Sequence, residues 1–187
     1  WLAPGNHDDS PTMQRLFGLP SVNGRCDYVV DLPGARLVVL DSTRSGREDG
    51  ALDTAQLTWL DNQLDGTPSI IAMHHPCIPL GGKAFDSIRL DDTSRAGLRD
   101  VVTSALRRGA RIHALVAGHA HITCFAEFAG VKAIIAPSSA YEFGLRDGVF
   151  SYQIGEPQYM EYSWSESGDD FLARVVTVND TLWRVMR

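Results

Sequence analysis

The chain has 187 residues, of which 44% are hydrophobic and 21% are charged, which is ordinary for a globular protein with a substantial core. Its formal net charge of −6 argues against stable nucleic-acid binding, because proteins that coat nucleic acids need a basic surface. No apolar run reaches the roughly 18 residues of a membrane-spanning helix, so we expect no membrane partner.

The cysteines indicate the redox compartment. Cys26, Cys77 and Cys124 are an odd, scattered set without CxxC spacing. This pattern predicts reduced thiols in a cytoplasmic protein, and one disulfide stays open as an alternative. The first residues have no basic stretch before an apolar one, so they do not resemble a signal peptide.

The first part of the chain alternates strand-like and helix-like segments. In chain order the sequence predicts the end of a buried strand at 1–3, a helix at 10–17, strands at 28–32 and 36–40, a helix that starts after residue 53, a strand at 69–73, a helix at 93–108 and a strand at 112–117. Ser10 is the expected N-cap of the first helix, with Pro11 as its first helical residue. Asp53 and Gln56 have the spacing of a capping box.

The pattern changes in the second part, where helical signals are absent. Strands are predicted at 122–128, 132–136, 158–164 and 172–178, with turns between them. Strands joined by helices, followed by consecutive strands, favour an α/β sandwich of two mixed sheets flanked by helices. We find no repeat or linker, so residues 1–187 are predicted to form a single domain.

Five of the six histidines lie in three short clusters, and each cluster directly follows a predicted strand. The clusters are Gly5-Asn6-His7-Asp8, His74-His75 and Gly118-His119-Ala120-His121. Because loops at the carboxyl ends of strands in α/β folds gather at one edge, these clusters can converge on a ligand. Imidazole nitrogens with amide or carboxylate oxygens are typical ligands of Zn, Mn, Fe or Co.

At these residues the chain resembles the calcineurin-like metallophosphoesterase superfamily, which is marked in order by DxH, GD, GNH[DE], a later His and GHxH. The last three motifs are present as Gly5-Asn6-His7-Asp8, His74 and Gly118-His119-Ala120-His121. The similarity is greatest to the cyclic-nucleotide and glycerophosphodiester phosphodiesterase branch. It rests on the extended forms Pro4-Gly5-Asn6-His7-Asp8-Asp9, Leu40-Asp41-Ser42-Thr43 and residues 73–81.

The resemblance implies a role for each matching residue. The implied metal ligands are Asn6, His74 and His119 for one ion and His121 for the other. His7 is implied to be a non-ligand histidine that stabilises charge on the phosphate or protonates the leaving group. Asp8 is implied to orient His7 through a hydrogen bond.

The resemblance also implies the reaction and its cofactors. Two divalent ions (Mn, Fe, Zn or Co) would hold a hydroxide that attacks a small phosphoester, most naturally a cyclic nucleotide or a glycerophosphodiester. The DxH and GD motifs belong before Gly5, and the sequence printed here does not contain them there. Asp31, Asp41 and Asp53 follow instead, in the wrong order to replace them. We therefore expect a C-terminal portion of a metallophosphoesterase catalytic domain, lacking its N-terminal strands, that holds one ion or none and is inactive alone.

A rival interpretation is a non-catalytic scaffold or regulatory domain with the same fold. The intact GNHD and GHAH motifs argue against it, since a binding module has little need of His7. Self-association into a homo-oligomer stays open.

Other reactive side chains have simpler roles in our interpretation. His75 remains open between supporting a ligand and facing the substrate. His113 lies inside a predicted strand and is expected to be structural. Cys77 and Cys124 adjoin the clusters, and inert thiols are favoured over ligands.

Two further features have both a binding and a non-binding interpretation. The loop at 81–92 carries Lys83 and Arg89, for which a solvated loop is favoured over a phosphate pocket. Aromatic side chains crowd the later region, where packing is favoured over stacking on a nucleobase. They are Tyr141, Phe143, Phe150, Tyr152, Tyr159, Tyr162 and Trp164.

Overall fold

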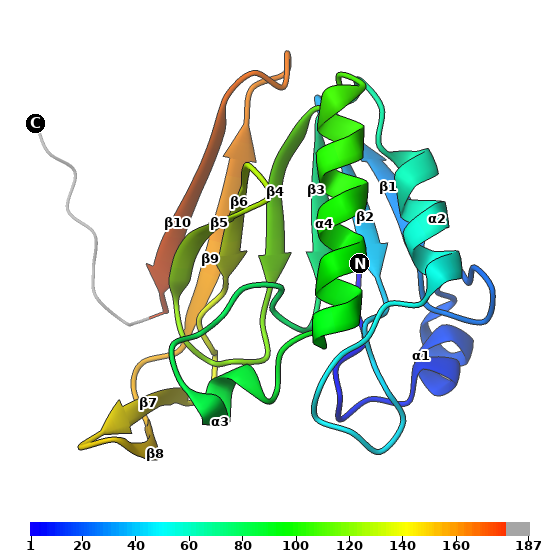
Figure 1. Ribbon diagram of the computed structural model, residues 1–187. Coiled ribbons are helices and arrows are strands. Elements are labelled where there is room, and N and C mark those ends of the chain that lie inside the picture. Colours follow the sequence, from blue (N-terminus) through cyan, green and yellow to red (C-terminus); the bar gives the residue numbers. More distant parts are fainter. Residues whose placement is uncertain (179–187) are drawn as a thin grey trace, which may run out of the picture.

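A six-stranded mixed sheet is the centre of the structure, a computed structural model that describes residues 1–178 (Figure 1). Its strand order is β1-β2-β3-β4-β6-β5. The strands are Tyr28–Leu32 (β1), Ala35–Leu40 (β2), Ser69–Met73 (β3), Ile112–Ala117 (β4), Cys124–Phe128 (β5) and Val131–Ile135 (β6). Strands β2, β3, β4 and β6 run parallel, and β1 and β5 pair antiparallel at the edges. This confirms the predicted α/β class.

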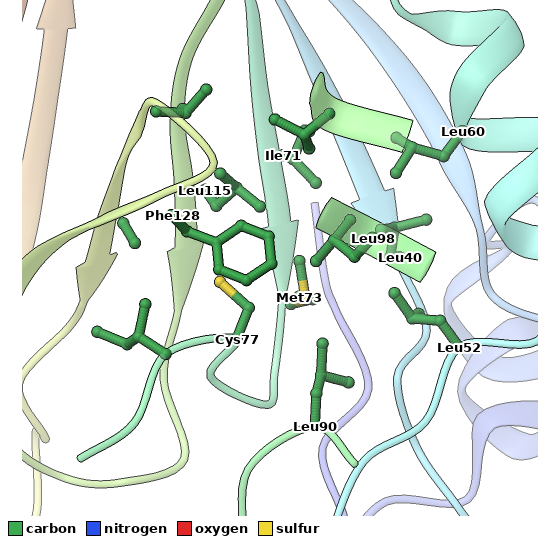
Figure 2. Packing of buried hydrophobic residues seen from close by; sticks show 14 of the residues in the cluster. Leu40, Leu52, Leu60, Ile71, Met73, Cys77, Leu90, Leu98, Leu115 and Phe128 are labelled. Carbon is green, nitrogen blue, oxygen red and sulfur yellow. The ribbon is translucent and has the colours of Figure 1, made fainter. Parts of the chain in front are cut away.

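The helices Thr54–Gln63 (α2) and Asp92–Arg107 (α4) cover one face of this sheet (Figure 1). The shorter helices Ser10–Phe17 (α1) and Lys83–Asp86 (α3) lie at the lower end of the sheet in Figure 1. Leu60 of α2 and Leu98 of α4 pack against the strand residues Leu40, Ile71 and Leu115 in one buried cluster (Figure 2). The burial of this apolar surface is the main force that holds the helices on the sheet.

The opposite face carries a smaller layer made of Gln158–Trp164 (β9) and Phe171–Thr177 (β10). Lys132 alternates with the core residue Ala133 along β6, so it points away from the helices. Its ammonium lies 5.4 Å from the ring centroid of Phe171, and His113 stacks on the same ring at 5.1 Å. In the described residues this layer is an antiparallel pair, smaller than the second mixed sheet that we expected.

The helix starts agree with the sequence in one case and differ in another. Asp53 and Gln56 form the predicted capping box of α2. The N-cap of α1 is Asp9 and not Ser10, because Asp9 has an extended backbone and its carboxylate accepts a 3.0 Å hydrogen bond from the N–H of Thr12. Ser10 is the first helical residue.

One other expectation was wrong, and one element was not predicted. Residues 1–3 are not a strand: Trp1 is 73% exposed, and Leu2 bonds to the Tyr28 hydroxyl through both its N–H and its carbonyl. In the part of the chain that the structure describes, no strand lies beside them to complete a ladder. A hairpin of Glu142–Arg146 (β7) and Val149–Gln153 (β8) was not predicted. Asp147-Gly148 gives its turn, with φ of 52° and 78°, as a type I′ turn requires.

The packing of α4 on the sheet can be tested with two equivalent substitutions. Leu98 is fully buried, so Leu98→Ala should lower the free energy of unfolding by about 2–5 kcal/mol through lost burial and a new cavity. Leu16 also lies on a helix but is 69% exposed, so Leu16→Ala should change it by less than about 0.5 kcal/mol. Urea denaturation followed by circular dichroism measures both, and equal losses would contradict the assigned core.

Candidate metal centre

The three predicted clusters meet at the carboxyl edge of the sheet. His74 follows β3, His119 follows β4, and Asn6 comes from the N-terminal loop. His74 Nε2 lies 3.0 Å from Asn6 Oδ1 and 2.9 Å from His119 Nδ1, although the residues are 68 and 45 positions apart. An amide oxygen and two imidazole nitrogens therefore share one small volume, as expected for ligands of a single ion.

Local backbone geometry makes this approach possible. A Cβ at Gly5 would lie 2.8 Å from Cε1 of His74, so only glycine lets the loop come this close. His119 and His121 have φ of 64° and 50°, a conformation that is uncommon for residues other than glycine. Backbone strain of this kind is often found where a site requires it. The Gly118 N–H also donates to the His74 carbonyl at 3.1 Å, which ties the GHAH turn to the end of β3.

His75 is a third imidazole in the same group. Ligand nitrogens of His74, His75 and His119 all lie within 4.8 Å of one another, and three such atoms can hold a metal ion. His75 is fully buried, and its Nδ1 lies 2.8 Å from the Ser42 hydroxyl oxygen. Complete burial excludes the substrate-facing role that the sequence left open for this residue.

Burial keeps these imidazoles uncharged at neutral pH. Burial, with a smaller effect of nearby histidines, lowers the pKa of His74 to about 3 and that of His75 to about 4. Burial also lowers the pKa of His119. The Glu48 carbonyl raises the pKa of His75 and of His119, although neither ring is in hydrogen-bond geometry with it.

The residues present fit a divalent cation. Neutral imidazoles offer lone pairs, and the buried Nε2 atoms of His75 and His119 have no hydrogen-bond partner in the described part of the chain. Buried polar atoms without partners are costly, and a cation in their midst would offset that cost. Imidazole nitrogen with amide oxygen is a donor set for Zn, Mn, Fe or Co.

The other predicted site residues lie around this cluster. His7 is exposed and lines a cavity of about 490 Å³ together with Asn6, His74, His119 and His121. His121 Nδ1 lies 3.0 Å from the Tyr141 carbonyl, and donation of its N–H there leaves Nε2 with a lone pair.

Asp8 contacts the backbone of its own loop. Its Oδ2 accepts a 2.8 Å hydrogen bond from the Gly5 N–H, and the Asp8 N–H donates to the Gly5 carbonyl at 2.9 Å. Within residues 1–178 the structure gives Asp8 no hydrogen bond to His7. Its contacts therefore shape the loop that carries Asn6 and His7.

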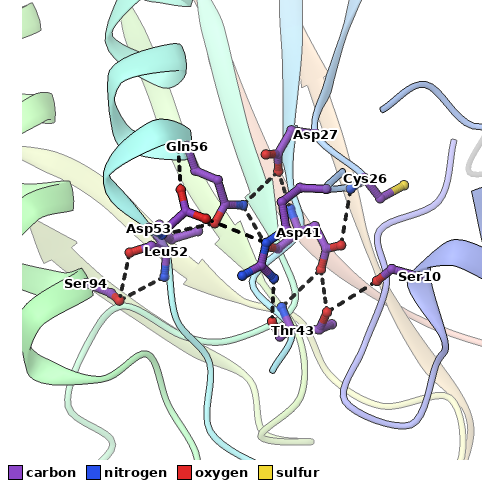
Figure 3. Close-up of polar contacts among 10 residues, drawn as sticks. Ser10, Cys26, Asp27, Asp41, Thr43, Leu52, Asp53, Gln56 and Ser94 are labelled. Carbon is purple, nitrogen blue, oxygen red and sulfur yellow. Dashed lines mark hydrogen bonds and ion pairs between the residues drawn. The ribbon is translucent and has the colours of Figure 1, made fainter. Parts of the chain in front are cut away.

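Sequence reasoning missed a buried polar network beside the site (Figure 3). Asp27 accepts hydrogen bonds from the Asp41 N–H at 2.7 Å and from Gln56 at 3.0 Å. Gln56 also donates to the Asp41 carbonyl at 2.9 Å. The network fixes the end of β2, where Ser42 holds His75. The sequence signals for this network are two polar residues beside strands: Asp27 before β1 and Ser42 after β2.

The aspartates that we left out of the ligand set have other partners. Asp41 accepts hydrogen bonds from Cys26 and Thr43, Asp53 caps α2, and Asp31 pairs with Arg36. None of these bonds leads toward the imidazole cluster.

Several weaker candidates lie elsewhere. Arg89 forms ion pairs with Asp86 and Asp92, and it does not line the cavity. Burial raises the pKa of the Cys77 thiol to about 12, which agrees with an inert thiol. Cys124 is half-buried and free. His113 packs against Phe171 in the second layer, away from the cluster.

Comparisons with known proteins agree with this geometry. No family model matches the chain. It is 38% identical over 145 residues to a probable cyclic nucleotide phosphodiesterase of Rhodococcus erythropolis, covering 74% of this chain and 45% of that protein. It is 33% identical over 144 residues to a cAMP/cGMP dual specificity phosphodiesterase of Mycobacterium tuberculosis, covering 73% and 42%. A dimetal phosphatase from Danio rerio shares the fold, with a TM-score of 0.51 and 19% identity over 71% of this chain and 59% of that chain.

These matches confirm the predicted resemblance to the calcineurin-like metallophosphoesterase superfamily. The chain spans about half the length of the curated relatives it matches. Among residues 1–178, no helix has the length and apolar character needed to cross a bilayer.

Removal of one candidate ligand should weaken metal binding. His119→Ala leaves two of three convergent donors, so the affinity for Zn²⁺ or Mn²⁺ should fall by about 100-fold or more. Isothermal titration calorimetry on the chain measures this. His113→Ala removes a histidine of the second layer and should leave the affinity unchanged. Equal affinities in His119→Ala and the unaltered chain would remove His119 from the ligand set.

The metal-free chain should lose stability as the solution is acidified. His74 and His75 are neutral in the folded state down to about pH 3 and 4, whereas in the unfolded state they take up protons below about 6.5. Their contribution is therefore complete above pH 6.5 and declines as pH falls. The midpoint temperature of unfolding in EDTA should be lower at pH 5 than at pH 7, and an unchanged or higher midpoint would contradict this.

Asp27 provides a control of opposite sign. Burial raises its pKa to about 6 from the ordinary 3.8, so its contribution is complete below pH 3.8 and declines as pH rises through 6. Asp27→Asn keeps an oxygen for its two hydrogen bonds and removes this opposing effect. The acid-induced fall in the midpoint should therefore be steeper in this variant.

Proposed function

We propose that this chain contributes its metal centre to a metal-dependent phosphodiesterase. The observation that carries the proposal is the convergence of Asn6 Oδ1, His74 Nε2 and His119 Nδ1 within about 3 Å contacts beside an open cavity. The names of the relatives, cyclic nucleotide phosphodiesterases, support the same reaction class. We take residues 1–187 as the C-terminal portion of one catalytic domain.

The side chains of the site divide the work. Asn6, His74 and His119 present neutral donors to one ion, and His121 presents Nε2 to a second, with its tautomer fixed by the Tyr141 carbonyl. Bound divalent ions would supply the Lewis-acid charge that activates water and offsets the charge on the phosphate. Mn, Fe, Zn and Co all suit this donor set.

His7 is proposed as the proton donor or charge-stabilising group. It follows the ligand Asn6 directly and lines the cavity, so it is near the place where a phosphate beside the ions would lie. From there a ring N–H can stabilise the transferring group or give its proton to the departing oxygen. Asp8 supports His7 indirectly, by holding the loop through Gly5.

One carboxylate in the cavity opposes the binding of monoesters more than that of diesters. Of the described residues that line the cavity, Glu48 is the one carboxylate. A phosphodiester carries one negative charge and a monoester close to two, so repulsion from Glu48 penalises the monoester more. Cyclic nucleotides and glycerophosphodiesters are both diesters, so the charge of Glu48 does not distinguish between them.

We also propose a cytoplasmic location. Cys26, Cys77 and Cys124 are all free, as expected for a reducing compartment. Small phosphoesters are the proposed partners, with no nucleic-acid partner at a net charge of −6.

The role of His7 gives the test of the reaction. The chain is joined to an N-terminal segment that carries the DxH and GD motifs, and hydrolysis of bis-p-nitrophenyl phosphate is measured with Mn²⁺ or Zn²⁺. His7→Ala should lower kcat by roughly 10²–10⁴ while the metal content stays constant, because His7 acts on the leaving group and not on the ions.

His113→Ala should leave kcat unchanged, since His113 lies in the second layer. Loss of metal in His7→Ala would show that His7 is a ligand. A folded, metal-loaded protein with no turnover would contradict the proposed function.

A further inference from the structure

The β7–β8 hairpin places an aromatic wall along the cavity that contains the candidate ligands. Tyr141, Phe143 and Phe150 line this cavity together with the candidate ligands. Tyr141 is 38% exposed and Phe150 is 42% exposed. Large aromatic side chains are usually covered, so this much exposed ring surface inside a cavity calls for a ligand or a partner.

The wall is anchored at both ends. At one end Phe150 packs edge-on against Phe85 of α3, with ring centroids 5.0 Å apart, and Phe85 belongs to the buried core. At the other end Phe143 stacks on His121 at 5.0 Å, and its N–H donates to the His121 carbonyl at 3.1 Å. The hairpin lies beside α3 in Figure 1. The rings are thus held at a fixed position relative to the metal ligands.

The lining of the cavity therefore has two chemically different parts. One part presents imidazoles and the Asn6 amide, which suit an anionic group beside metal ions. The other part presents aromatic rings, which suit a flat, uncharged ring. Its volume of about 490 Å³ is in the range that holds a small organic ligand. A glycerol or ethanolamine group has no flat face to stack on such a wall.

We infer that the aromatic wall, Tyr141 with Phe143 and Phe150, binds the heterocyclic base of a nucleotide and so selects nucleotide diesters over glycerophosphodiesters. This inference rests on the proposed function for the position of the phosphate. It takes up, for these three rings, the stacking role that the sequence analysis gave as the less favoured alternative to packing. Tyr152, by contrast, is 68% exposed and does not line the cavity.

Binding of a matched ligand pair tests the wall without turnover. Adenosine 5′-monophosphate and ribose 5-phosphate differ only in the base, and each is titrated into the Zn²⁺-loaded chain with NMR of the aromatic resonances. The nucleotide should bind about 10-fold or more tightly than the sugar phosphate, because base stacking on an aromatic side chain commonly contributes such a factor. Equal affinities would overturn the inference.

Two variants then locate the effect. Phe150→Leu keeps an apolar side chain against Phe85 but removes the ring, so it should remove most of the difference between the ligands. Tyr159→Leu removes a partly exposed ring of β9 that does not line the cavity and should keep the difference. Unfolding midpoints of both variants show that the fold is retained. A Phe150→Leu variant that still prefers the nucleotide fully would contradict the assignment.

Turnover separates this inference from the proposed function. In the joined protein described above, Phe150→Leu should lower kcat/KM for adenosine 3′,5′-cyclic monophosphate by about 10-fold through KM and leave that for glycerophosphoethanolamine unchanged. Equal losses for both substrates would mean that the ring is structural and would sink the inference alone. Absence of any diester hydrolysis would sink the proposed function, while the binding result would still decide whether a base stacks here.

Discussion

The site depends on a group of uncharged imidazoles forced together at the end of a parallel sheet. Strands β3 and β4 are neighbours with the same direction, so His74 and His119, which follow them, must lie side by side. Burial of several ring nitrogens without enough partners is unfavourable, and protonation does not relieve it because a buried positive charge costs more. A divalent cation is the species that satisfies these donors together. The tight turns at His119 and His121 are consistent with that requirement.

The same constraint explains why much of the site was predictable from the sequence. Two of the three histidine clusters directly follow buried strands, β3 and β4, and strand ends are the part of an α/β fold that pattern reading places best. The roles of individual atoms were less accessible. Asp8 was expected to bind His7, but its carboxylate accepts a hydrogen bond from the Gly5 N–H. Because Asp8 directly follows His7, its side chain reaches the backbone of its own turn more easily than the neighbouring imidazole. The burial of His75 depends on Ser42, more than 30 positions earlier, and on the close approach of Gly50, which no local pattern shows.

The fold was predicted best where local and tertiary signals coincide. The capping box at Asp53 and the parallel core strands are examples, because hydrophobic pattern and burial agree there. The β7–β8 hairpin was missed although Asp147-Gly148 is a strong turn signal, since its flanking residues do not alternate between buried and exposed positions. Residues 1–3 look apolar enough for a strand, yet a strand also needs a neighbour to pair with, and sequence alone does not supply one.

The most direct test of the account is a crystal structure of the chain loaded with Zn²⁺, with the ion located by anomalous scattering. We expect one ion about 2.0–2.2 Å from Asn6 Oδ1 and from a ring nitrogen of both His74 and His119, without movement of the sheet. An ion bound elsewhere, or these three side chains turned away from one another in the metal-loaded protein, would contradict it.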